Sequence, residues 1–271
     1  MPQPIHPWFR NAFLSGFLLS LMAAIQLFVL GEHTESYFAW TIQSALTAST
    51  LGGFYFGSMT FGYLSARETV WANVRGPAVG LFFFVTVSMA ATLLHLDKFH
   101  FASASLLPRL AAWIWLAIYL LIPAGLAASF FMQTKVRGAD PQPSASLPTG
   151  YRLLLLVHSA AGILSALALF FTPQFILPFW PWTLTPLTAR ALSAWLFSFG
   201  ILNAVSLRED DWPRLRIMST AYVVSAAFAI LALLRYHREA DLTSIGGALY
   251  LLYLGVMLAC GAYGWHRSTR N

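Results

Sequence analysis

Long apolar segments recur along the chain, and the short segments between them hold most of the polar residues. Several of these segments approach the roughly 20 residues that an α-helix needs to cross a bilayer. They lack the strict alternation of barrel strands, so helices are the expected way to cross. The pattern predicts eight transmembrane spans, at residues 11–30, 46–66, 77–96, 110–133, 151–172, 187–206, 217–236 and 244–265.

Composition supports this prediction. Apolar residues make up 58% of the 271 positions and charged residues only 10%, whereas about a quarter of a soluble domain is charged. A chain so poor in charge cannot cover a water-facing surface, so lipid is its expected surroundings. Cys260 is the only cysteine, which excludes a disulfide framework and a cysteine-based metal cluster. The predicted fold class is an all-α integral membrane protein.

The chain also contains an internal repeat. Residues 134–150 have the glycine, proline and serine content of a linker. On either side of this linker the sequence repeats at an offset of 141 residues, and positions 46–76 and 187–217 share 10 identities in 31 without a gap. We therefore expect a first four-helix transmembrane repeat (1–133), a cytoplasmic linker (134–150) and a second four-helix repeat (151–271).

The repeat and the charges predict an orientation. An even number of helices brings each repeat back to its starting side, so the two repeats are expected to be related by a pseudo-two-fold axis along the membrane normal. With the N-terminus inside, the inner segments hold eleven Arg and Lys residues and the outer segments hold five. This excess predicts a protein of the plasma (cell inner) membrane with both termini in the cytoplasm.

A charged motif closes the second span of each repeat on the cytoplasmic side. Its members are Arg67, Glu68, Trp71 and Arg75 in the first repeat, and Arg208, Glu209, Trp212 and Arg216 in the second. In a structural interpretation, arginine caps the helix end, glutamate pairs with a neighbouring arginine and tryptophan anchors the chain at the headgroups. That interpretation explains every residue type. A functional one is a docking site for a soluble partner or an anionic lipid.

Three residues within the predicted spans are candidate ligand-binding residues. Arg190 lies about one turn below the start of the sixth span, where a charge is costly, although an arginine this shallow can snorkel to the interface. His158 can ligate haem or a chlorophyll-type pigment through its neutral imidazole. The small residues that follow it suit either a flat macrocycle or helix packing. Asn203 is expected at a cavity between the repeats, with other polar groups such as Ser198, Thr47 or Ser58.

The sequence lacks the usual signs of catalysis and of ion coupling. It contains no glycine-rich phosphate loop, no carboxylate pair within one span and no His-x-x-x-His pair, and all its Asp and Glu residues lie at helix ends or in loops. An ion-coupled pump normally needs acidic groups near the middle of the membrane. We therefore expect a non-catalytic protein rather than an enzyme, with no metal site and no nucleic-acid partner.

Three functions remain open. The first is an accessory subunit of a larger membrane assembly, or a holder of a lipophilic ligand, because the spans are free of mid-membrane charge and rich in aromatic residues. The second is a permease for an apolar or weakly polar small molecule, with its path between the repeats. The third is a membrane enzyme that acts on lipid or quinone through Arg190, His95 and Asp97 at the outer face.

Overall fold

The computed structural model describes residues 1–270, and within that range the chain is all-helical, with no β-strand. Eight helices are long: α1 (Pro7–Ala24), α3 (Ala45–Arg67), α4 (Trp71–Leu93), α5 (Leu106–Gln133), α6 (Thr149–Phe171), α8 (Pro186–Glu209), α9 (Trp212–Arg235) and α10 (Ile245–Ser268). Two are short, α2 (Thr34–Tyr37) and α7 (Pro173–Ile176). The expected helical class is therefore confirmed.

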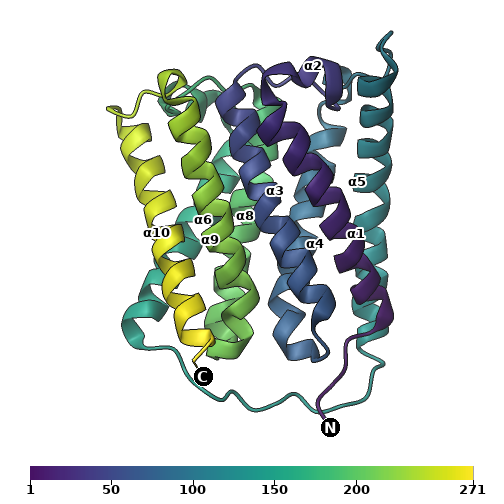
Figure 1. The fold of residues 1–271 in the computed structure, drawn as a ribbon, viewed down its shortest axis with the longest axis vertical. Coiled ribbons are helices and arrows are strands. Elements are labelled where there is room, and N and C mark those ends of the chain that lie inside the picture. The colour runs from purple at the N-terminus through teal and green to yellow at the C-terminus, as the bar shows by residue number, and fades with distance from the viewer. Residues whose placement is uncertain (271) are drawn as a thin grey trace.

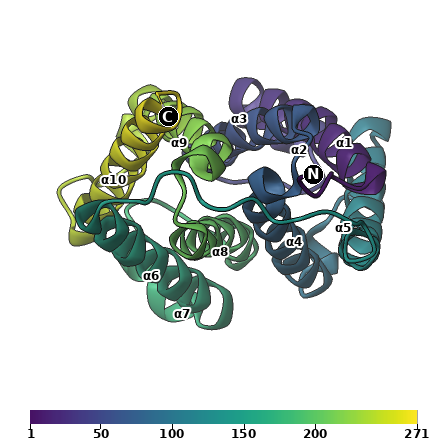
Figure 2. The same ribbon diagram turned by 90° about the horizontal axis from the view of Figure 1, so that it is seen from below.

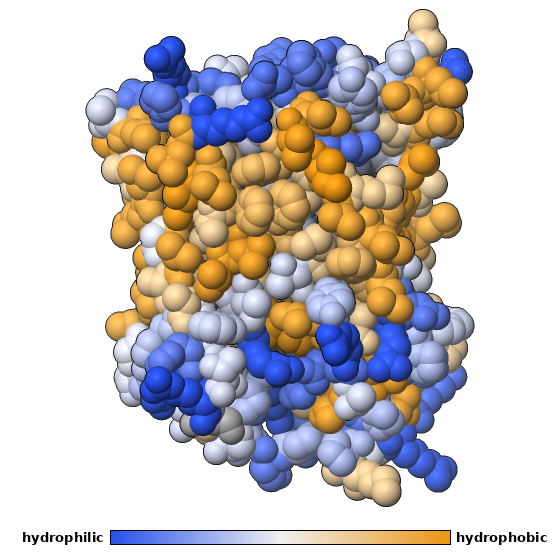
Figure 3. Space-filling view, in the orientation of Figure 1, coloured by the Kyte–Doolittle hydropathy of each residue, from blue (hydrophilic) through white to orange (hydrophobic). Residues whose placement is uncertain are grey.

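Seven helices are long and apolar enough to cross a membrane. They are α1, with the π-helical turn Ile25–Val29 that extends it, and α4, α5, α6, α8, α9 and α10. On the face of the molecule seen in Figure 3, an apolar band lies between two polar ends. Helix α3 has the same length as α4, 23 residues, but is rich in glycine, serine and threonine, and most of it is buried. These features suit a helix enclosed by other helices.

The long helices run nearly parallel and form one bundle (Figure 1). Helices α3, α4, α8 and α9 make up its centre, with α1 and α5 on one side and α6 and α10 on the other (Figure 2). Helix α3 packs along α9, and α4 packs along α8; α1 covers α3, and α6 covers α8. We call the α3–α9 and α4–α8 contact surfaces the α3–α9 seam and the α4–α8 seam.

Side-chain caps explain where several of these helices begin. The Ser44 side chain accepts a hydrogen bond from the backbone N–H of Thr47 at the start of α3. Thr185 and Thr188 form a capping box at the start of α8, with Pro186 at the first helical position. Such caps satisfy amide groups that have no partner within the helix.

Two helices begin five or six residues earlier than the sequence pattern predicts, the largest differences at any helix start. Helix α4 starts at Trp71 rather than near residue 77, and α9 starts at Trp212 rather than near 217. The expected spans left out the first two turns because those turns carry arginines. In the structure Arg75 lies in such a turn and has carboxylate partners, so its charge does not end the helix.

Both ends of the described chain lie at the same end of the bundle, which we call the terminal face; the opposite end is the far face (Figure 1). The segment between α5 and α6 crosses the terminal face from one side to the other (Figure 2). It is joined to the N-terminal segment, where the N–H of Gln3 donates to the carbonyl of Ala139 at 3.0 Å. The N–H of Trp71 in turn donates to the carbonyl of Gln3 at 2.9 Å.

Candidate functional site

The charged motifs meet at the terminal face and pair with each other. Arg75 on α4 donates two hydrogen bonds of 2.7 Å each to the carboxylate of Glu209 at the end of α8. Arg216 on α9 makes an ion pair with Glu68, which follows α3. Arg75 and Arg216 therefore each bond the glutamate of the other motif, and the two pairs tie α4 to α8 and α9 to the end of α3.

The tryptophans of the motif are core residues. Trp71 is 7% exposed, and its ring lies 4.9 Å from that of Phe9. Trp212 is 1% exposed and lies 4.9 Å from the ring of Tyr151. The expectation that these tryptophans anchor the chain at lipid headgroups was wrong. The remaining motif arginines, Arg67 and Arg208, are exposed.

The linker adds further bonds to this network. Asp140 accepts a hydrogen bond from Arg75 at 2.9 Å. Asp211 accepts from the backbone N–H of Ser144 at 2.8 Å, and Asp210 pairs with Arg152 at 2.7 Å. The terminal face of the bundle is thus closed by a continuous set of charged contacts.

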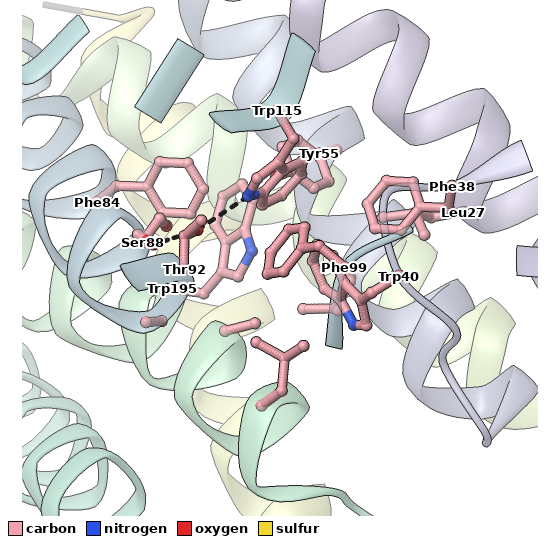
Figure 4. A pocket seen from close by; sticks show the side chains of 14 residues that line it. Leu27, Phe38, Trp40, Tyr55, Phe84, Ser88, Thr92, Phe99, Trp115 and Trp195 are labelled. Atoms are coloured by element: carbon pink, nitrogen blue, oxygen red, sulfur yellow. Dashed lines mark hydrogen bonds between the residues drawn. The ribbon is translucent and has the colours of Figure 1, made fainter. Parts of the chain in front are cut away.

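A first cavity lies between α3, α4, α5 and α8, toward the far face (Figure 4). Its walls are almost entirely apolar and aromatic: Leu27, Phe38, Trp40, Leu51, Tyr55, Phe84, Ser88, Ala91, Thr92, Phe99, Trp115, Leu187, Ala191 and Trp195. Tyr55 and Trp115 in the wall have hydrogen-bond partners, whereas the buried Trp40 Nε1 has none within residues 1–270. The Tyr55 and Tyr119 hydroxyls lie 3.0 Å apart, and Trp115 Nε1 donates to Thr92 Oγ1 at 3.0 Å. The wall therefore offers aromatic faces rather than charge.

A second cavity follows the first along the centre of the bundle. The two cavities share Phe84 and Trp195, whose rings lie 4.2 Å apart and separate them. Ser198 lines the second cavity and donates to the carbonyl of Gly80 at 2.9 Å; Ser58 also lines it. The free spaces are about 20 Å³ and about 30 Å³. Each has room for about one or two water molecules, so any larger ligand has to move the rings.

Aromatic loops cover the first cavity at the far face. Phe38, Trp40 and Phe99 form this cover, and the Trp40 and Phe99 rings lie 5.2 Å apart. Backbone bonds hold the two loops together, since the N–H of His100 donates to the carbonyl of Ala39 at 2.9 Å. The side chain of His100 makes a further 3.0 Å bond with the carbonyl of Phe38.

Arg190 lies at the far-face end of the α4–α8 seam. Its Nη1 lies 2.7 Å from His95 Nε2, and its Nε donates to the carbonyl of Phe170 at 2.9 Å. Burial of His95, and then the charge of Arg190, lower the pKa of the imidazole. Within residues 1–270 no carboxylate makes an ion pair with Arg190. Asp97 instead pairs with Lys98, so the expected set of Arg190, His95 and Asp97 does not assemble.

His158 and Asn203 lie together in a separate place. Asn203 Nδ2 and His158 Nδ1 are 3.0 Å apart, and the ring of Tyr253 lies 4.3 Å from that of His158. Asn203 lines neither of the two cavities. It lies 13 residues from Arg190 along α8, or roughly 20 Å, so the candidate residues form two separate groups.

The surroundings of His158 do not fit a haem or a chlorophyll-type pigment. Beyond it, α6 and α8 approach so closely that a Cβ at Gly162 would lie 2.9 Å from the carbonyl oxygen of Leu196. A Cβ at Gly200 would lie 3.0 Å from the carbonyl oxygen of Ser159. The small residues therefore serve helix packing and leave no gap for a macrocycle on that side of the histidine.

The sequence did not single out the residues that matter most to the cavities. Phe84 and Trp195 look like ordinary apolar residues of a span. One signal could have identified Trp195, because tryptophan in a transmembrane helix favours the interfaces and this one lies in the middle of α8.

Comparison with known proteins identifies no relative: no family model, no curated protein and no solved structure matches the chain.

Proposed function

We propose that this chain is a non-catalytic membrane protein that holds a small lipophilic ligand between its helices. The observation that carries the proposal is the first cavity, whose wall combines aromatic rings with a few hydroxyl and indole groups and no charged side chain. Such a wall favours an apolar or weakly polar guest, because a charged one would find no counter-charge there.

The proposal includes the architecture predicted from the repeat. All eight long helices cross the plasma membrane, the terminal face is cytoplasmic, and the two halves arose by duplication. The reciprocal pairs Arg75–Glu209 and Arg216–Glu68 support the duplication, since each residue sits 141 positions from its counterpart. The packing of the helices supports the duplication as well, because α1 packs on α3 in the first half as α6 packs on α8 in the second.

The test is to purify the protein gently from its own membrane, extract it with organic solvent and analyse the extract by mass spectrometry. Ala191 lines the first cavity, so an Ala191→Phe variant fills the space that the ligand would take. Ala160 is exposed on α6, so Ala160→Phe is the matched control. We expect one compound at about one per chain in the parent and the control, and little in Ala191→Phe. Equal amounts in all three, or no compound, would overturn the proposal.

The same preparation tests the accessory-subunit form of the function. Partner proteins that co-migrate in fixed proportion would place the chain in a larger assembly. An absorption spectrum is recorded alongside, and we expect it to show no haem or chlorophyll-type band because the surroundings of His158 do not fit such a group.

A permease for a weakly polar molecule is the second candidate. It is favoured by the succession of two cavities along the bundle centre, above a terminal face closed by ion pairs. Its test is osmotic swelling of proteoliposomes in glycerol or urea. Swelling faster than that of protein-free liposomes, and slowed by Ala191→Phe, would put this candidate first. The enzyme hypothesis is not favoured, because Asp97 pairs with Lys98 and makes no ion pair with Arg190.

A further inference from the structure

A ligand can approach the first cavity from the water at the far face, between α4 and α5, through the α3–α9 seam or through the α4–α8 seam. Between α4 and α5, the hydrogen bond from Trp115 Nε1 to Thr92 Oγ1 closes the wall. The water side is closed by the two aromatic loops. These loops are bonded to each other through the His100 N–H to the Ala39 carbonyl and through the His100 ring to the Phe38 carbonyl. Opening that side breaks several bonds and exposes Phe38, Trp40 and Phe99 to water.

The α3–α9 seam is closed even more firmly. At its far-face end Glu239 accepts hydrogen bonds from Ser44 Oγ at 2.7 Å and from the Leu46 N–H at 3.2 Å. Deeper in the seam the two backbones touch. A Cβ at Gly53 would lie 3.0 Å from the backbone nitrogen of Ala229. Separating these helices breaks charged bonds and a close backbone contact.

The α4–α8 seam is held by side chains instead. A Cβ at Gly80 would meet only the branched end of the Leu202 side chain, which can rotate. Three direct side-chain bonds join the two sides within the described chain: Arg75 to Glu209 at the terminal face, Ser198 to Gly80 in the middle and Arg190 to His95 at the far face. Arg190–His95 is thus the one direct side-chain bond at the far-face end.

This bond lies next to the cavity. The face of α4 that lines the cavity carries Phe84, Ser88, Ala91 and Thr92, and His95 continues it by one turn. On α8 the lining residues Leu187 and Ala191 flank Arg190. If the Arg190–His95 bond breaks, α4 and α8 can separate at this point and open a path into the cavity.

We propose that the ligand enters sideways from the bilayer between α4 and α8, and that the Arg190–His95 contact closes this entrance. The inference rests on the proposed ligand-holding function and narrows its ligand class. A molecule that arrives by this route has to dissolve in the bilayer first, so it is a lipid-soluble compound rather than a water-soluble solute.

The chemistry of the contact makes the entrance sensitive to pH. Neutral His95 accepts a hydrogen bond from Arg190 through Nε2. Protonated His95 has no free lone pair there and carries the same charge as Arg190, so acid breaks the contact. Asp97 and Lys98 are the other charged groups that act on His95, and they oppose each other. Phe170 contributes only its carbonyl, which bonds Arg190.

Thiol labelling tests the proposal. Cys260, the only cysteine, is buried, and a Cys260→Ala background removes it. Ala191→Cys then places one thiol in the cavity wall, and Ala104→Cys places a reference thiol in the exposed loop before α5. Both are labelled with N-ethylmaleimide, which is membrane-permeant, in full-length protein in liposomes. The rate at Ala191→Cys is divided by the rate at Ala104→Cys to cancel the effect of pH on thiols.

We expect this ratio to rise several-fold between about pH 8 and about pH 4.5. The range extends well below the ordinary histidine pKa of about 6.5 because the pKa of His95 is lowered. In His95→Gln the amide oxygen can still accept from Arg190 but does not titrate, so the ratio stays low at both pH values. In His95→Phe the contact is absent, so the ratio is high at both. A ratio that does not change with pH, or that rises equally in His95→Gln, would overturn the inference.

This outcome can be told apart from the fate of the proposed function. The labelling pattern needs no bound ligand, whereas the extraction experiment needs no movement of the seam. If the labelling ratio rises in acid as expected but the extract holds no compound, the sideways entrance stands and the ligand-holding function is overturned. If the extract holds a compound but the labelling ratio does not change with pH, the ligand-holding function stands and the entrance is overturned.

Discussion

Arg75 and Glu209 form a two-pronged ion pair that joins α4 to α8, with both hydrogen bonds at 2.7 Å. The Glu209 side chain is 7% exposed, and it also bonds Arg214. The counterpart pair is more exposed at both partners. Arg216 is 51% exposed against 31% for Arg75, and Glu68 is 14% exposed against 7% for Glu209. The Glu209 pair is therefore the more buried of the two, and its carboxylate has a second arginine partner.

This difference predicts unequal costs for the same substitution. Glu209→Gln removes the charge between two arginines in a buried place, and we expect a loss of roughly 3 kcal/mol in the free energy of unfolding. Glu68→Gln is the matched control and should cost less than about 1 kcal/mol. Denaturant unfolding in detergent micelles measures both. Equal losses would show that neither burial nor the second arginine sets the strength of these pairs.

The α3–α9 seam depends on a glycine at its closest approach. A Cβ at Gly57 would lie 1.8 Å from Ser225 Oγ and 2.9 Å from the carbonyl oxygen of Ala221. Gly57→Ala should therefore force the helices apart and cost about 1–3 kcal/mol. Gly125 on α5 has open space around its Cβ position, so Gly125→Ala should be neutral or gain up to about 1 kcal/mol. A Gly57→Ala protein as stable as the parent would mean that the seam is looser than the structure shows.

The helical class could be predicted because long apolar segments leave a local pattern in the sequence. The starts of α4 and α9 could not, because charged residues normally mark the end of a membrane span. The arginines of these helices have partners from distant parts of the chain, such as Glu209 for Arg75. Spacing along the sequence carries no information about such partners.

The candidate site was harder to predict than the fold. Phe83 and Phe84 are neighbours of the same type, but only Phe84 lines the cavities. Which of the two faces the cavities depends on the rotation of α4 about its axis. The sequence of a helix that is apolar on all sides does not indicate that rotation. For Arg190 and His95 the sequence placed both near the outer face, and their contact depends on how α4 and α8 pack.

Glu32 gives a prediction for the effect of pH. A hydrogen bond from Tyr236 at 2.8 Å, followed by the charge of Arg235, lowers the pKa of Glu32. The folded protein therefore holds this proton less tightly than the unfolded chain does. The stabilisation is complete above the ordinary glutamate pKa of about 4.3, and it is lost as the pH falls through the lower pKa of the folded state.

The matched variant for this prediction is Tyr236→Phe, which removes the hydroxyl donor and keeps the ring. At neutral pH the variant should melt at a lower temperature than the parent. The gap between the two proteins should narrow below about pH 4, as Glu32 becomes protonated. Melting curves from about pH 7 to about pH 3 measure it. A constant gap over that range would mean that the hydroxyl stabilises the fold without acting on the Glu32 carboxylate.

His158 and Asn203 should behave as one unit. The 3.0 Å contact between Asn203 Nδ2 and His158 Nδ1 is buried. The remaining polar atoms of the two side chains, His158 Nε2 and Asn203 Oδ1, have no hydrogen-bond partner within residues 1–270. His158→Phe or Asn203→Leu alone leaves a buried polar group without its partner, which costs about 1–3 kcal/mol. The double variant removes both groups, so its loss should fall short of the sum by at least about 0.5 kcal/mol. If the losses simply add, the contact contributes no free energy to the fold, and both polar groups then need another reason to be buried there.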